Sequence, residues 1–231
     1  MSQDRIWLDV LFSEKDAAKA AGARWDPKAR RWYAPRPGIA ALGRWRPAPP
    51  IPELLPGEDR SFGSGLFVDL VPSTCWFTNA RSCLTQQDWE RIRRMVLGRA
   101  DRRCEVCQAG ADRDVQRWLE VHERWAYDDN TCVQTLRRLI CLCTPCHTAT
   151  HYGLAQLRGH DAAARDHLMQ VTRFSPEQAD QRIYDAFTLW RDRSRHTWTL
   201  DLSLLTSAGV TPTPPPTADR RPSIARDQLP T

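Results

Sequence analysis

The chain has 231 residues, of which 41% are hydrophobic and 26% are charged, and its formal net charge is +5. This is enough for one large domain or two small ones with a buried core, which excludes a chain that is disordered throughout. No apolar run approaches the length of about 18 residues that a membrane span needs, and the first residues lack the order of a secretory signal, so we expect a cytoplasmic protein without a membrane partner.

Residues 4–46 predict a small N-terminal α/β module. The run RIWLDVLF is typical of a strand, a short alanine-rich helix begins after Ser13 and ends at Gly22, and a second strand surrounds Trp32. This pattern, with the segment GARWD, resembles a short domain of unknown function found beside primase-like and other DNA-processing proteins of plasmids. Exposed tryptophans and arginines would suit stacking on bases, whereas Trp25 and Trp32 can instead form the core of so small a unit.

Three further regions follow the module. The proline-rich segment 47–59 predicts a linker, and residues 60–205 contain the apolar runs, helix signals and cysteines of a second domain. Residues 206–231 hold several prolines and little apolar content, which is typical of a disordered tail. Helix-start signals occur at Thr85 and at Ser175, and the mixture of strands and helices predicts an α+β fold.

Cysteine spacing gives the strongest signal in the chain. Two CxxC pairs in a chain without a secretory signal favour a structural zinc ion over disulfides, because each pair turns both sulfurs toward one point. A redox protein that uses the pairs as dithiols is the alternative, and it would carry no zinc. The four predicted zinc ligands are Cys104, Cys107, Cys143 and Cys146.

Three histidines accompany these cysteines. His122 lies in the strand-like run LEVHERW between the two pairs, His147 follows the last cysteine directly, and His151 comes four residues later. On a helix this spacing places His147 and His151 on one face, where they can hold one divalent ion, and His122 on an opposite strand can add a third group. Surface histidines without a metal are the alternative for this spacing taken alone.

The motifs CEVC, LEVHERW and LICLCTPCH, together with His151, resemble the zinc-knuckle branch of the HNH endonucleases over roughly residues 85–155. The resemblance implies a ββα-metal core, here extended by C-terminal helices, in an endonuclease or nickase that hydrolyses phosphodiester bonds in DNA. It also implies that Mg²⁺ or another divalent ion is held by His147 and His151, and that His122 activates the attacking water.

The chain departs from that family pattern at two positions. The residue beside His122 is Glu123, where the family has histidine or aspartate, and Arg138 or a neighbour replaces an expected asparagine. Either a carboxylate, Glu120 or Glu123, takes a role in the catalytic site, or the domain is an inactive zinc-binding module that binds nucleic acid or a protein partner. Flanking arginines are candidates for phosphate contacts or plain surface charge: Arg102, Arg103, Arg137 and Arg138.

Overall fold

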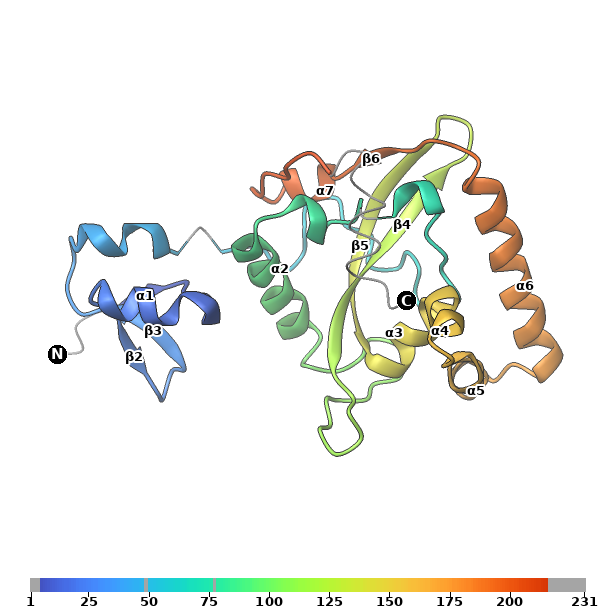
Figure 1. The fold of residues 1–231 in the computed structure, drawn as a ribbon, viewed down its shortest axis with the longest axis horizontal. Coiled ribbons are helices and arrows are strands. Elements are labelled where there is room, and N and C mark those ends of the chain that lie inside the picture. The colour runs from blue at the N-terminus through green and yellow to red at the C-terminus, as the bar shows by residue number, and fades with distance from the viewer. Residues whose placement is uncertain (1–4, 48–49, 77, 216–231) are drawn as a thin grey trace. The chain divides into compact units, whose positions relative to one another are not determined.

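The computed structural model describes residues 5–47, 50–76 and 78–215, and the chain divides into two compact units, residues 1–50 and 51–231 (Figure 1). Each unit has its own hydrophobic core. The predicted mixed α+β class is confirmed, since the units contain two three-stranded sheets and several helices. Within the described ranges, no helix is both long and apolar enough to cross a membrane.

The first unit is an antiparallel sheet with the strand order β1-β3-β2. Gly22 adopts a φ of +100° just after α1, a conformation that favours glycine and that lets the chain turn into β2. Trp32 packs against the core of this unit, whereas Trp25 is 47% exposed. The elements are β1 (Ile6–Leu8), α1 (Lys15–Ala20), β2 (Arg24–Asp26) and β3 (Arg31–Ala34), with 3-10 helices at Phe12–Glu14 and Ala40–Trp45.

The second unit is built around the antiparallel hairpin β4-β5, to which β6 adds in parallel. Helix α2 lies on one side of the hairpin, and α3 to α5 lie on the other with α6 outside them (Figure 1). The main elements are α2 (Gln86–Arg99), β4 (Leu119–Asp128), β5 (Val133–Cys143), α3 (Thr144–Thr150), α4 (Tyr152–Leu157), α5 (Asp161–Thr172), α6 (Pro176–Arg193), β6 (Thr199–Asp201) and α7 (Ser203–Thr206). Short 3-10 helices lie at Ser73–Cys75 and Arg81–Cys83.

Local sequence explains where these elements begin. The Thr85 hydroxyl accepts a hydrogen bond from the backbone of Asp88 at the start of α2, and Ser175 and Gln178 form a capping box at the start of α6. Strand β5 is the most deeply buried part of the unit, since residues 139–143 are each at most 1% exposed. Helix α3 follows β5 directly, with Cys143 as its N-cap residue, so side chains from the hairpin and the helix are brought together.

The predicted linker 47–59 is only partly a linker. Leu55 is fully buried, and the enclosed carboxylate of Glu58 accepts two hydrogen bonds of 2.6 Å from the Arg99 guanidinium. Proline content is typical of linkers, but one buried leucine and one buried ion pair fix the later half of this segment to the second unit.

The predicted tail 206–231 likewise begins later than expected. Val210 is 3% exposed, and the backbone of Thr213 donates a 2.7 Å hydrogen bond to the Cys83 carbonyl. The chain therefore contacts the domain as far as Thr213, and the part of the prediction that covers 216–231 lies outside the described residues.

Candidate metal centres

Four cysteine sulfurs of the second unit converge, two from the loop before β4 and two from the junction of β5 and α3. One ligand atom from each of the four residues lies within 4.8 Å of the others, and the Cys107 and Cys143 sulfurs are 3.4 Å apart. Zn–S bonds of about 2.3 Å in a tetrahedron require sulfurs about 3.8 Å apart, so the spacing fits one zinc ion. The members are Cys104, Cys107, Cys143 and Cys146.

The electrostatics of the four thiols favour a cation. Hydrogen bonding to Cys104 raises the pKa of Cys143 to about 12 and also raises the pKa of Cys146. Thiols this close repel one another once ionised, and a bound divalent ion removes that penalty. From α5, the His167 Nε2 atom lies 3.1 Å from the Cys146 sulfur. The sequence spacing of the CxxC pairs gives no signal for this contact, which depends on how α5 packs.

Glu105 lies between the first two cysteines and connects the loop that carries them to the sheet. Its carboxylate accepts a 2.8 Å hydrogen bond from the backbone of Cys141 and one of 2.9 Å from Arg138. The Arg138 side chain is only 6% exposed. The prediction that Arg138 contacts phosphate is therefore wrong, because this guanidinium is used inside the protein. Arg137, by contrast, is exposed.

A second cluster consists of His122 on β4, His147 on α3 and His151 at the end of α3. One nitrogen from each ring lies within 4.8 Å of the others, and the ring centroids are 4.6 to 5.4 Å apart. His122 is 3% exposed, and neither of its buried ring nitrogens has a hydrogen-bond partner among the described residues. Buried polar atoms normally have partners, so these unpaired nitrogens fit a site that receives a metal ion or a water molecule.

All three imidazoles are neutral at pH 7. Burial, with a smaller contribution from the Arg124 charge, lowers the pKa of His147 to about 4. Burial also lowers the pKa of His151 to about 3 and holds the pKa of His122 well below its ordinary value. A neutral imidazole keeps a lone pair for a metal or a proton, so the cluster is in the correct state for either role.

The two candidate carboxylates on β4 lie on different sides. Glu120 points toward the cluster, with Oε2 3.3 Å from Nδ1 of His147. Glu123 accepts a 3.1 Å hydrogen bond from the backbone of Ala80, and burial raises the pKa of its carboxyl to about 7. Side chains alternate along a strand, so the neighbour of His122 faces away from it. Of the two carboxylates named from the sequence, Glu120 lies beside the histidine cluster and Glu123 does not.

Arg124 is a site residue that the sequence prediction missed. It lies two positions after His122 on β4, its side chain is fully buried, and its guanidinium is 3.6 Å from the Asp69 carboxylate and 4.2 Å from the ring centroid of Phe67. Its positive charge lowers the pKa of the neighbouring histidines, as described above. The alternation of the strand was the signal that would have identified it.

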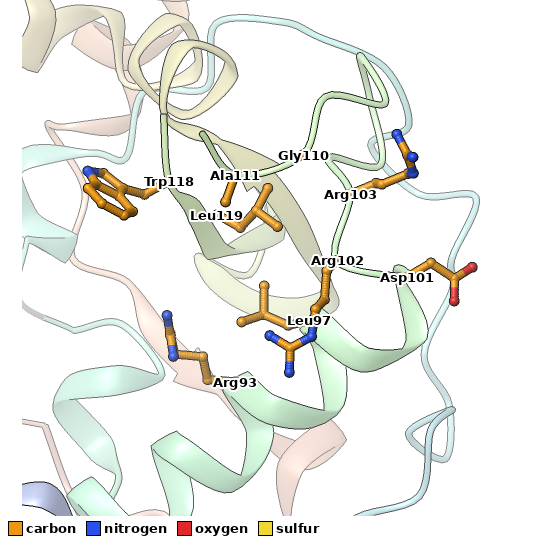
Figure 2. A pocket seen from close by; sticks show the side chains of 9 residues that line it. All are labelled: Arg93, Leu97, Asp101, Arg102, Arg103, Gly110, Ala111, Trp118 and Leu119. Atoms are coloured by element: carbon orange, nitrogen blue, oxygen red, sulfur yellow. The ribbon is translucent and has the colours of Figure 1, made fainter. Parts of the chain in front are cut away.

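A pocket of about 450 Å³ lies between α2 and the loop that carries the first CxxC pair (Figure 2). Arg93 and Arg102 are at its wall, Arg103 points away from Arg93, and Trp118 is 48% exposed. The pocket adjoins the start of β4, where burial raises the pKa of the Glu120 carboxyl and the Arg93 charge offsets part of that rise. Arg102 and Arg103, two of the predicted phosphate contacts, are exposed and line this pocket.

Comparison with known proteins identifies relatives for part of the chain. Residues 5–47 match a family described as a domain of unknown function, DUF5710. A DNA primase TraC from Escherichia coli is 44% identical over 103 residues, which is 42% of this chain and 7% of the primase. Another DNA primase TraC from Escherichia coli is 47% identical over 47 residues, which is 20% of this chain and 4% of that primase.

These matches fit the predicted N-terminal module, which is similar to a domain of unknown function and to parts of DNA primases. The chain spans less than a tenth of the length of the primases that it matches. No solved structure gives a significant match.

Proposed function

We propose that the second unit is a metal-dependent endonuclease or nickase that hydrolyses phosphodiester bonds in DNA. The single observation that carries this proposal is the cluster of three neutral imidazoles, His122, His147 and His151, beside a separate group of four cysteines. The order hairpin, then helix, with histidines on both, is the arrangement that the resemblance to HNH endonucleases implies. Similarity to DNA primases supports DNA as the partner of the chain.

The two clusters suit different metal ions. Four thiolates make a closed site, which fits a structural zinc ion that ties the first CxxC loop to β5 and α3. Two imidazole ligands, from His147 and His151, leave coordination positions open, and imidazole suits ions such as Ni²⁺ or Zn²⁺ better than Mg²⁺. A divalent ion bound there would polarise the phosphate and stabilise the leaving oxygen.

Each residue of the cluster has a separate role in this proposal. His147 and His151 are partly exposed and would hold the ion where a DNA strand can reach it, while the Glu120 carboxylate orients the His147 ring through Nδ1. His122, which its lowered pKa keeps neutral and whose ring nitrogens have no hydrogen-bond partner among the described residues, would accept the proton of the attacking water. Burial keeps the imidazoles neutral, and the positive charge of Arg124 makes a smaller contribution in the same direction.

Cleavage of supercoiled plasmid tests the proposal. The full chain is incubated with the plasmid in Mn²⁺ and in Mg²⁺, beside His122→Ala, His147→Ala and, as a matched control, the exposed His160→Ala. We expect the parent and His160→Ala to convert plasmid to the open-circular or linear form, and the two cluster variants to lose this activity with zinc content unchanged. Cleavage that survives both cluster variants would contradict the proposal.

A second candidate is a catalytically inactive zinc-binding module that binds nucleic acid or a protein partner. The orientation of Glu123 favours it, because the position beside His122 supplies no ligand to the cluster. This candidate predicts that the folded, zinc-loaded protein binds its partner but cleaves no plasmid in any metal. It also predicts that His147→Ala leaves binding unchanged.

A further inference from the structure

The sheet of the first unit has one face that its helix does not cover. Leu8 and Ala34 are buried with Ala18 of α1, so these strand positions face the helix. Since side chains alternate along a strand, the neighbouring positions Trp7 and Tyr33 face the opposite way. Both are only partly buried, and neither belongs to the buried core of the unit.

Aromatic and cationic side chains lie together on this open face. The strand register places Trp7 opposite Tyr33 and Tyr33 opposite Arg24, so the three residues form a row across β1, β3 and β2. The two aromatic rings meet edge to face with centroids 6.2 Å apart. The guanidinium carbon of Arg31 is 5.3 Å from the Trp7 ring, and that of Arg5 is 4.9 Å from the Tyr33 ring.

The charge of the chain is concentrated in the same unit. Residues 5–47 contain ten Lys or Arg and four Asp or Glu, a net charge of +6, whereas the whole chain has +5. Two of those four acids lie near arginines of the face: Asp26 pairs with Arg5, and Asp9 lies 4.0 Å from Arg31. Both arginines are about half exposed, although their carboxylate partners are only 9% exposed, so the guanidinium groups remain accessible to a ligand.

We propose that this face binds single-stranded DNA, with bases stacked on Trp7 and Tyr33 and phosphates bound by the surrounding arginines. An incoming base would replace a guanidinium over the ring, and the displaced arginine would then reach the adjacent phosphate. Aromatic rings beside cations on an open sheet suit unpaired bases, whose faces are free, whereas duplex bases are covered by their neighbours. This proposal concerns a surface separate from the histidine cluster and stands whether or not the second unit is a nuclease.

Binding of the full chain to a fluorescein-labelled oligothymidylate, measured by anisotropy across a salt series without added Mg²⁺ or Mn²⁺, tests the proposal. We expect Trp7→Leu and Tyr33→Leu each to weaken binding by about five-fold or more, the loss of one stacked base. We expect Arg24→Gln to reduce the slope of log affinity against log salt by about 0.7, the value for one phosphate contact. The matched control is Arg36→Gln, an exposed arginine of the same unit outside the sheet, which we expect to leave the slope unchanged.

Circular dichroism and thermal unfolding of each variant exclude loss of fold as the cause of weaker binding. His160→Ala, at an exposed histidine of the other unit outside both clusters, should bind the oligonucleotide as the parent does. Equal effects of Arg24→Gln and Arg36→Gln would show that only the overall charge of the unit contributes to binding, and this would overturn the proposal. Tighter binding to duplex DNA than to the oligothymidylate, or unchanged binding by both aromatic variants, would overturn it as well.

Discussion

The different orientations of two neighbouring glutamates on β4 give a sharp test of the histidine cluster. Glu120 lies 3.3 Å from Nδ1 of His147 and its side chain is 40% exposed, so Glu120→Ala removes the group that orients this ring without opening a cavity. Loss of such a supporting carboxylate lowers metal affinity by about 10- to 100-fold, or about 1.4 to 2.8 kcal/mol. The stability of the fold should change by less than about 0.5 kcal/mol.

Glu123→Gln is the matched control, because Glu123 is in the same strand but its carboxylate binds the backbone of Ala80. The amide oxygen of glutamine can still accept that hydrogen bond, so Mn²⁺ affinity should stay within about two-fold of the parent. Isothermal titration of the zinc-loaded protein with Mn²⁺ measures both variants. Weaker binding by Glu123→Gln together with normal binding by Glu120→Ala would refute the assignment.

Three other outcomes follow from the described contacts. Arg99→Ala leaves the fully enclosed Glu58 carboxylate without its cationic partner, so the free energy of unfolding in urea should fall by about 3 to 5 kcal/mol. A decrease below about 1 kcal/mol would contradict the assignment of a buried ion pair. Cys143→Ser should lose zinc by elemental analysis and the cooperative unfolding of the second unit, and retained zinc would show that the four sulfurs are not its ligands. Burial lowers the pKa of His147 to about 4 and that of His151 to about 3, so both rings stay neutral in mild acid. Mn²⁺ affinity should therefore stay constant from about pH 8 down to about pH 6. A free imidazole with a pKa of about 6.5 would already be mostly protonated at the lower end of this range.

Local patterns predicted a large part of this structure. The CxxC spacing identified the four sulfurs that converge, and the helical spacing of His147 and His151 placed them on one side of α3. Capping signals located the starts of α2 and α6. In each case the physical cause lies within a few residues of chain, which is why one sequence was enough.

Features that depend on distant segments were not predicted. Arg138 is buried because Glu105, on the zinc loop, meets it across the fold, and no local pattern links the two. The fixed half of the proline-rich segment depends on Glu58 reaching Arg99 on α2. Glu123 is different, because the alternation of side chains along β4 is a local pattern that by itself predicts the face opposite His122 for this residue.

The division between a structural zinc ion and a separate ion at the histidines is tested most directly by anomalous diffraction. Crystals of the full chain grown with Mn²⁺ are measured at the zinc and manganese absorption edges. We predict a zinc peak among the four cysteines and a manganese peak at His147 and His151, beside His122. A structure with no metal at the histidines, or with manganese bound elsewhere on the second unit and zinc absent from the cysteines, would contradict this assignment.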